Sequence, residues 1–459
     1  MSNYFLFGSK VVAIADTKLN NETVKKLWNS FSYGCSEIEF SEGADNSFVI
    51  GETELPILSD GKEYAISVNE KGVAVVGANY GGLLRGFIAL IMQIQYNSLE
   101  EGKEELKIVG FNTESNYKLK NRMIHICVFP EDSFYSIKKL IRFAGICQYT
   151  HIVIEFWGML KYDCLKELAW DNAFTKEQAR ELVKIAKELG MEAIPMFNQL
   201  GHATASRVCY GKHVVLDQNP RLQDLFTPDG WAWDLTNPKV LKFLKNVRKE
   251  LYDLFPDSEY IHIGCDEAYY YSDCEELRKQ LPTLLSTLAN EVIRENRRPM
   301  LWMDMILEKE KFTGYEANGK SGECEAILNA LPKESVFVDW QYDVKKAPIE
   351  TLEYLNSFGY DTIGAPWLNR QNYDAHIETL TKNNMYGIML TTWHTLHGEN
   401  GMPAVLGCAE DLGAITLYWS KQTHTWGERN TETATLLRRI SFEGNSYDDC
   451  GWKQKQVVV

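Results

Sequence analysis

The segment Tyr260-Ile261-His262-Ile263-Gly264-Cys265-Asp266-Glu267 decides how the rest of the chain is interpreted. It is an apolar run of strand type that ends in two adjacent carboxylates. Burying unpaired charge is costly, so two acids at the end of a buried strand indicate a working site. Other strands that end in polar or aromatic side chains would then belong to the same site.

Eight apolar runs of this kind alternate with helical patterns in the larger, C-terminal part of the chain. Eight strands separated by helices are typical of an α/β fold of the (β/α)8 TIM barrel type. A doubly wound open sheet is the alternative, but it usually shows an early glycine-rich phosphate fingerprint. The expected strands are 123–127, 151–157, 192–197, 260–266, 299–304, 336–340, 361–365 and 387–393, and the expected helices include 136–146, 175–189, 238–254 and 281–296.

A small N-terminal α/β domain is predicted to precede the barrel. Residues 1–113 form this domain, and residues 114–459 form the barrel with a C-terminal helix at 432–440 and a tail. Strand-like runs at 64–68 and 72–77 predict a hairpin, and the polar run 98–105 predicts a loop. A glycine-opened helix follows the hairpin at 80–94. Its glycines indicate close packing of helix on sheet rather than a phosphate cradle.

Composition excludes several classes of partner. The formal net charge is -15, which argues against nucleic acid and anionic membrane surfaces. No window approaches the roughly 20 apolar residues that span a bilayer, and the N-terminus lacks a signal pattern. Ten scattered cysteines without a CxxC pair predict reduced thiols and a cytoplasmic protein. A homo-oligomer is compatible with this composition, which leaves the oligomeric state open.

The ends of the predicted strands carry an unusual set of side chains. In a barrel these positions meet at one face, where the functional groups lie. Four tryptophans reach this face from four consecutive strands, and acids accompany them. Aromatic walls with acids at the base are what a sugar pocket needs, because pyranose rings have apolar faces and a rim of hydroxyls. The side chains are Glu155, Trp157, Asn198, His202, Asp266, Glu267, Trp302, Asp304, Asp339, Trp340, Tyr342, Trp367, Asn369, Trp393 and His394.

The carboxylate pair suggests glycoside hydrolysis, since most such enzymes use two carboxylates. Neighbouring residues in a regular strand point to opposite faces. Asp266 and Glu267 are therefore expected to have different roles, one inside the pocket and one on the following loop.

The motifs resemble those of glycoside hydrolase family 20, the β-N-acetylhexosaminidases. The segment 261–267 resembles the signature H-x-G-G-D-E, and 193–202 resembles V-I-P-E-x-D-x-P-G-H. The segment 64–94 is similar to the family's small N-terminal domain. Gly364-Ala365-Pro366-Trp367 and Thr391-Thr392-Trp393 are similar to its last two tryptophan strands.

The resemblance implies a retaining exo-glycosidase that removes terminal N-acetylglucosamine or N-acetylgalactosamine from a small glycan or glycoconjugate, without metal or cofactor. The 2-acetamido carbonyl of the substrate would be the nucleophile, giving an oxazolinium-type intermediate. Glu267 would be the general acid and then base, and Asp266 would orient the acetamide. His202, Trp302, Trp340, Tyr342, Trp367, Asn369 and Trp393 would bind the sugar, and His262 and Asn198 would belong to a supporting network.

Some positions depart from the family pattern. The tyrosine expected directly after Trp367 is Leu368, so Tyr342 or Tyr373 would replace it. The arginine expected after the first barrel strand has no counterpart, and His394 stands where an acid usually follows Trp393. These departures bear on which sugar epimer is bound.

Two alternatives remain beside the hydrolase. A non-catalytic sugar-binding protein on a hydrolase scaffold would explain the missing arginine and tyrosine. A metal-dependent barrel hydrolase would need clustered ligands, typically HxH in the first strand. That strand offers only His125, which is interpreted as a core or network histidine.

Overall fold

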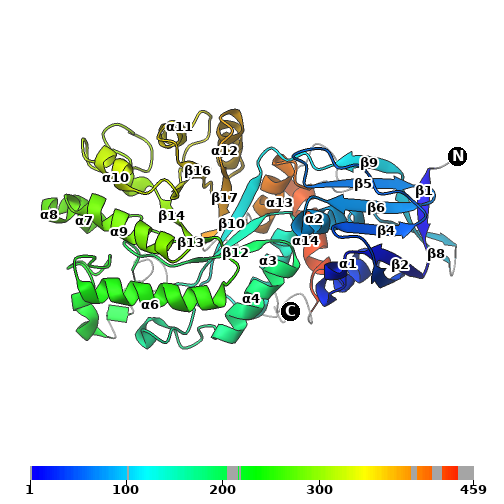
Figure 1. Ribbon diagram of the computed structural model, residues 1–459, viewed down its shortest axis with the longest axis horizontal. Helices are drawn as coiled ribbons and strands as arrows, with labels where there is room; N and C mark the ends of the chain where they lie inside the picture. Colours follow the sequence, from blue (N-terminus) through cyan, green and yellow to red (C-terminus); the bar gives the residue numbers. More distant parts are fainter. Residues whose placement is uncertain are drawn as a thin grey trace, which may run out of the picture.

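A computed structural model describes residues 3–100, 103–203, 215–216, 219–393, 401–415 and 426–442. A small domain lies beside a larger barrel domain, on the right and left of Figure 1 respectively. The last strand of the small domain ends at Glu114, and the first barrel strand begins at Asn121.

A six-stranded sheet forms the centre of the small domain. Strands β2 and β3 are parallel, and the other neighbours in the order β3-β2-β4-β6-β5-β9 are antiparallel. The hairpin of β5 and β6 is confirmed. The strands are β2 (Lys10–Ala15), β3 (Glu37–Glu42), β4 (Ser47–Gly51), β5 (Tyr64–Asn69), β6 (Gly72–Gly77) and β9 (Phe111–Glu114); the helices are η1 (Thr17–Leu19), α1 (Glu22–Phe31) and α2 (Tyr80–Ile91).

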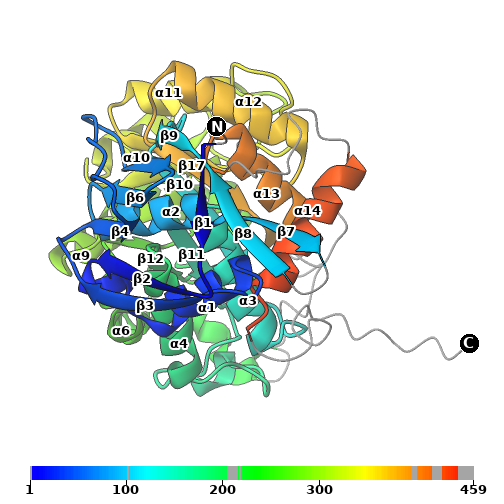
Figure 2. The ribbon, with the colours of Figure 1, turned by 90° about the vertical axis from the view of Figure 1, so that its right-hand side faces the viewer.

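A second sheet of three strands corrects the prediction of a loop at 98–105. Strands β1 (Tyr4–Phe7), β8 (Lys103–Val109) and β7 (Gln95–Glu100) pair in this order, and all are antiparallel. Figure 2 shows them at the end of the small domain that faces away from the barrel. Strand pairing uses backbone groups, so a hairpin at the surface can form without an apolar alternation in its sequence.

The glycines of α2 allow the helix to pack closely on the chain beneath it. A Cβ atom on Gly82 would lie 2.1 Å from the carbonyl oxygen of Glu63, and one on Gly86 would lie 2.6 Å from a methyl of Val75. Asn79 begins the helix, since its side chain accepts a hydrogen bond from the Gly82 amide at 2.9 Å. The packing interpretation of these glycines is therefore supported.

Eight parallel strands close into the predicted barrel. Each expected run overlaps one observed strand, and neighbours in the chain are neighbours in the barrel. Inward side chains such as Met123, Met196, Met300 and Met389 fill the interior. The strands are β10 (Asn121–Cys127), β11 (His151–Glu155), β12 (Glu192–Met196), β13 (Tyr260–His262), β14 (Arg298–Trp302), β15 (Val336–Asp339), β16 (Asp361–Gly364) and β17 (Gly387–Thr391).

Helices surround this barrel. Thr175 begins one of them with a capping box, exchanging hydrogen bonds with Gln178. The last helix packs against α13, α3 and α1, so it joins the barrel to the small domain. The helices are α3 (Phe134–Ile146), η2 (Lys166–Leu168), α4 (Lys176–Glu188), η3 (Pro220–Leu225), α6 (Pro238–Leu254), α7 (Tyr269–Asp273), α8 (Glu275–Arg278), α9 (Leu281–Arg294), η4 (Asp304–Ile306), α10 (Cys324–Ala330), α11 (Glu350–Ser357), α12 (Arg370–Lys382), α13 (Gly401–Asp411) and α14 (Trp426–Arg439).

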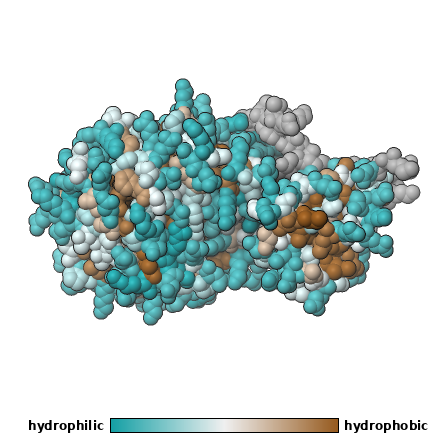
Figure 3. Space-filling model, turned by 45° about the horizontal axis from the view of Figure 1, so that its top comes forward, coloured by the Kyte–Doolittle hydropathy of each residue, from teal (hydrophilic) through white to brown (hydrophobic). Residues whose placement is uncertain are grey.

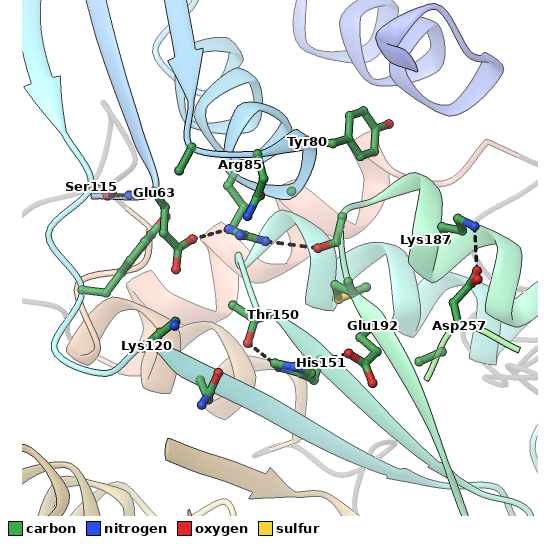
Figure 4. A pocket seen from close by; sticks show the side chains of 18 of the residues that line it. Glu63, Tyr80, Arg85, Ser115, Lys120, Thr150, His151, Lys187, Glu192 and Asp257 are labelled. Atoms are coloured by element: carbon green, nitrogen blue, oxygen red, sulfur yellow. Dashed lines mark hydrogen bonds and ion pairs between the residues drawn. The ribbon is translucent and has the colours of Figure 1, made fainter. Parts of the chain in front are cut away.

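An ion cluster holds the two domains together beside an interdomain cavity. The carboxylate of Glu63, in the small domain, forms ion pairs with two arginines. Arg85 Nε lies 2.5 Å from it, and Arg122 Nη1, from the first barrel strand, lies 3.2 Å from it. Burial alone would raise the pKa of Glu63, but the two guanidinium groups lower it below its ordinary value. The cavity of about 840 Å³ lies between this cluster and the starts of β11 and β12, where His151 and Glu192 line it (Figure 4).

Replacing Glu63 with Ala should leave two buried guanidinium groups without this carboxylate. We expect the free energy of unfolding to fall by about 3 kcal/mol, the usual cost of breaking a buried ion pair. The control is Glu39→Ala, whose partner Lys10 is more than half exposed (57%), and which should cost less than about 1 kcal/mol. Urea unfolding followed by circular dichroism measures both. Equal losses would show that the Glu63 cluster does not stabilise the domain interface.

Apolar side chains gather on one face of the small domain, seen in brown in Figure 3. The exposed apolar residues of this domain include Val12 and Ile14 in β2, and Leu55 and Ile57 in the loop after β4. In the parts of the chain that the structure describes, no helix has both the length and the apolar character to cross a membrane.

Candidate active site

The backbone after β13 turns sharply before it reaches the two acids. The strand ends at His262, four residues earlier than the predicted end at Asp266. Gly264, Cys265 and Glu267 then have φ angles of 67°, 81° and 48°. These angles lie in the left-handed region, which is uncommon for residues other than glycine and often marks functional sites. Position 264 also favours glycine for a steric reason, since a Cβ atom there would lie 2.0 Å from Asn198 Oδ1.

This turn brings both acids to one histidine. His202 Nε2 lies 3.3 Å from Asp266 Oδ2 and 2.9 Å from Glu267 Oε2. The expectation that the acids would face opposite ways, one inside the pocket and one on the loop, is therefore wrong. It assumed a regular strand, and the left-handed residues remove the alternation.

The two acids also set the charge of His202. Burial alone would lower the pKa of the imidazole, but Asp266 and then Glu267 raise it to about 10. The histidine is therefore protonated at neutral pH.

Stability should depend on pH through this histidine. The folded-state pKa is about 10 and the ordinary value is 6.5. Between these two pKa values the folded state retains a proton that the unfolded chain releases. The free energy of unfolding therefore falls as pH rises from about 6.5 to about 10. We expect the melting temperature to fall between about pH 7 and about pH 9.5, and to fall less in His202→Gln. Calorimetry at both pH values measures this difference, and equal falls in both proteins would contradict the assignment.

Asp304 supports the backbone of Glu267 from the next strand. Its Oδ2 accepts hydrogen bonds from the Glu267 amide at 2.9 Å and from Asn318 Nδ2 at 2.8 Å. Its Oδ1 accepts one from Trp340 Nε1 at 3.4 Å. Burial, and then the nearby Asp266 carboxylate, raise the pKa of Asp304 to about 7. The fixed position of Glu267 thus depends on the buried carboxyl group of Asp304.

The predicted tryptophans form one aromatic cluster with Tyr342. Trp393 Nε1 donates a hydrogen bond to the Tyr342 hydroxyl at 2.8 Å. The Tyr342 ring lies 5.2 Å from that of Trp340 and 5.4 Å from that of Trp367. Trp302 completes the cluster, 6.1 Å from Trp393. The structure thus brings together four side chains that the sequence supplies from separate strands.

A buried polar network lies beneath this cluster. Glu155 accepts a hydrogen bond from Asn198 Nδ2 at 2.6 Å and contacts His125 Nε2 at 2.8 Å. His262 packs against Trp302 at 4.4 Å, and burial keeps its pKa well below the ordinary value. Asn198 and His125 therefore share a hydrogen-bonded network through Glu155, and His262 packs against Trp302 outside these hydrogen bonds.

Two other predicted residues have different positions. Asn369 is exposed and begins α12, where its side chain accepts a hydrogen bond from the Asn372 amide at 3.3 Å. Tyr373 is buried on the same helix with its hydroxyl 3.4 Å from Arg429. Of the two candidate tyrosines, Tyr342 is therefore the one within the aromatic cluster. His394 lies outside the described residues.

One aromatic residue of the site, Trp231, is not among the residues predicted from the sequence. Trp231 lies on the loop between β12 and α6, and its Nε1 donates to the Glu267 carbonyl at 2.5 Å. Its ring lies 4.5 Å from that of His202. Trp231 is not at the end of a strand, so only the unusual Trp231-Ala232-Trp233 pattern marks it in the sequence. Trp157, which was noted only as a strand-end residue, stacks against both His202 and Trp393.

Several buried polar atoms of this site have no hydrogen-bond partner among the described residues. They are Asp266 Oδ1, Trp302 Nε1, Trp157 Nε1 and His202 Nδ1. Buried polar groups are rarely left unpaired, so each needs an explanation. A ligand with both hydroxyl or amide groups and an apolar face would satisfy them. Among the residues that the structure describes, no group of three or more His, Cys, Asp or Glu side chains has a geometry suited to a metal ion.

Comparisons with known proteins give a consistent result for the fold. A β-N-acetylhexosaminidase of family GH20 from Streptomyces coelicolor A3(2) superposes with a TM-score of 0.65 at 16% identity, over 100% of this chain and 96% of that one. A GH20 exo-β-N-acetylglucosaminidase from Vibrio harveyi superposes with a TM-score of 0.67 at 14% identity, over 96% of this chain and 75% of that one. At these identities the likeness shows the fold alone.

This chain spans about a third of the length of each of two sequence relatives. The lacto-N-biosidase of Bifidobacterium bifidum is 24% identical over 404 residues, which are 85% of this chain and 33% of that protein. A β-hexosaminidase of Porphyromonas gingivalis is 22% identical over 306 residues, 58% of this chain and 38% of that protein. The family model for the catalytic domain of glycosyl hydrolase family 20 matches residues 158–440, more than half of the chain. The chain therefore belongs to glycosyl hydrolase family 20.

Proposed function

We propose that this protein hydrolyses terminal β-linked N-acetylhexosamine, with retention of configuration at the anomeric carbon. The observation that carries the proposal is the pair Asp266–Glu267, held together by His202 beneath an aromatic cluster. Membership of the family and relatives named as β-hexosaminidases support the same substrate class. The substrate is a glycan or glycoconjugate with a terminal sugar of either gluco or galacto configuration.

In the proposed mechanism, Glu267 is the general acid and then the general base. Its proton passes to the glycosidic oxygen as the bond to the anomeric carbon breaks, and the bonding electrons leave with that oxygen. Glu267 then accepts a proton from the water that completes hydrolysis. The Asp304 carboxyl accepts a hydrogen bond from the Glu267 amide and so holds the Glu267 backbone in its left-handed conformation.

The nucleophile in this mechanism is the 2-acetamido carbonyl of the substrate itself. Asp266 would accept a hydrogen bond from the acetamide N–H through Oδ1, the oxygen without a partner among the described residues. A carboxylate there also stabilises the positive charge of an oxazolinium-type intermediate. The Tyr342 hydroxyl, which accepts from Trp393, would donate to the acetamide oxygen.

Aryl N-acetyl-β-hexosaminides test this function directly. We expect release of the phenol from the glucosaminide, the galactosaminide or both. Binding of the corresponding free sugar without release of phenol would instead identify a sugar-binding protein on a hydrolase scaffold. Loss of release after treatment with a chelator, restored by a divalent metal ion, would identify a metal-dependent hydrolase.

A further inference from the structure

Two stacked aromatic residues contact Glu267 at different groups: Tyr269 contacts its carboxylate and buried Trp231 its backbone carbonyl. The Tyr269 hydroxyl donates a hydrogen bond to Glu267 Oε1 at 2.6 Å. The ring of Trp231 lies 6.2 Å from that of Tyr269 with an interplanar angle of 23°, so the two rings are stacked. Tyr269 lies at the start of α7 and Trp231 on the loop before α6, so two separate segments build this aromatic pair.

The two oxygens of Glu267 have different surroundings. Oε2 contacts His202, whose side chain is 13% exposed. This oxygen therefore faces the buried side of the site, where His202 also contacts Asp266. Oε1 contacts Tyr269, which is 44% exposed. A proton donor must face the bond that it cleaves, and the group beyond that bond extends toward solvent in an exo-acting enzyme. The exposed side of Glu267 is therefore the side from which the leaving group departs.

We propose that Tyr269 and Trp231 form the binding site of the leaving group, and that Tyr269 is a positioning residue for Glu267 Oε1. The proposal rests on the hydrolase function above and extends it to the second sugar. The leaving group that fits is a pyranose, because its apolar face can cover an exposed aromatic ring. Trp231 supports this arrangement, since its indole nitrogen donates a hydrogen bond to the Glu267 carbonyl at 2.5 Å.

The hydroxyl of Tyr269 affects how readily Glu267 gives up its proton. A donor on Oε1 stabilises the ionised carboxylate, and so it lowers the pKa of Glu267 relative to the same site without the donor. Tyr269 itself keeps its proton, because burial and the Glu267 carboxylate raise its pKa far above the ordinary value. The proton that reaches the leaving oxygen thus comes from Glu267, and no proton leaves the tyrosine.

Tyr269→Phe tests the positioning role through the pH profile of kcat/KM. Activity falls at high pH when the general acid loses its proton. A higher pKa of Glu267 therefore moves this alkaline limb of the profile to higher pH. We expect Tyr269→Phe to move the alkaline limb to higher pH by about one unit, the order of one charge-assisted hydrogen bond. Tyr270→Phe is the control, since it removes the hydroxyl of the next residue on the same helix. An unmoved limb in Tyr269→Phe, or an equal shift in both variants, would overturn the positioning role.

Tyr269→Ala tests the leaving-group site through KM. Two substrates share the same terminal sugar: a disaccharide with a pyranose leaving group and the methyl glycoside. We expect the ratio of the KM of the disaccharide to that of the methyl glycoside to rise by about 3- to 10-fold in Tyr269→Ala, from loss of one aromatic contact. Tyr269→Phe, which retains the ring, should keep the ratio of the wild type. An unchanged ratio in Tyr269→Ala would overturn the leaving-group site.

Failure of the function itself would look different. If the wild-type protein cleaves neither the disaccharide nor an aryl glycoside, the hydrolase function is wrong. If the wild type cleaves them and the variants show neither change, the function stands and the assignment of Tyr269 and Trp231 is wrong.

Discussion

Replacing Glu267 with Gln is expected to lower kcat on aryl N-acetyl-β-hexosaminides by about 10³-fold, within the usual range for loss of a general acid–base group. Glutamine retains the size of the side chain and can accept the hydrogen bond from Tyr269, but it cannot deliver a proton to the leaving oxygen. The variant should still bind substrate. Initial rates and calorimetric titration with a substrate analogue measure the two effects separately.

Glu275→Gln is the matched control for this experiment. Glu275 lies on the short helix α8, close to Glu267 in the chain, and it pairs with exposed Lys279. Its replacement should leave both kcat and binding unchanged. A Glu267→Gln variant that turns over at the wild-type rate would exclude Glu267 as the proton donor.

Replacing Asp266 with Asn is expected to lower kcat by about 10²- to 10³-fold on substrates that carry the 2-acetamido group, as for loss of one stabilising group in a preorganised site. The carboxylate is needed as an acceptor for the acetamide N–H and as a negative charge beside the oxazolinium. Removing the Asp266 carboxylate also removes the larger of the two effects that raise the pKa of His202. A thiazoline mimic of the intermediate should inhibit the variant more weakly than the wild type, which inhibition constants measure.

Asp339→Asn is the control for the loss of a buried carboxylate at the end of a barrel strand. Asp339 accepts hydrogen bonds from Thr351 at 2.6 Å and Gln341 at 2.8 Å, away from the acid pair. Its replacement should not change how tightly the thiazoline binds. Equal inhibition of Asp266→Asn and the wild type would show that Asp266 does not hold the acetamide.

The barrel could be predicted from sequence because its strands are buried on both faces. Each is a short apolar run, such as 123–127 or 336–340, and the helices between them have clear periodicity. The prediction was weaker in the small domain. There a hairpin with a polar run at 98–105 forms two strands of the second sheet, because backbone pairing does not require apolar side chains.

The residue types of the site and the meeting of its tryptophans at one face were predictable, but the placement of the two acids was not. The position of Asp266 and Glu267 on one side of His202 depends on three left-handed backbone angles, which no side-chain pattern reveals. Trp231 was missed because its loop reaches Glu267 only through the tertiary fold. Asn369 was predicted as a sugar contact from its place after a strand, and that place also suits a helix cap.

The measurement that tests the account most directly compares two aryl β-glycosides that differ only at carbon 2. One carries the acetamido group and the other a hydroxyl. Because the acetamide is the proposed nucleophile and is held within reach of the anomeric carbon, kcat/KM should be higher for the acetamido substrate by about 10³-fold or more. Equal cleavage of the two substrates would contradict substrate-assisted catalysis.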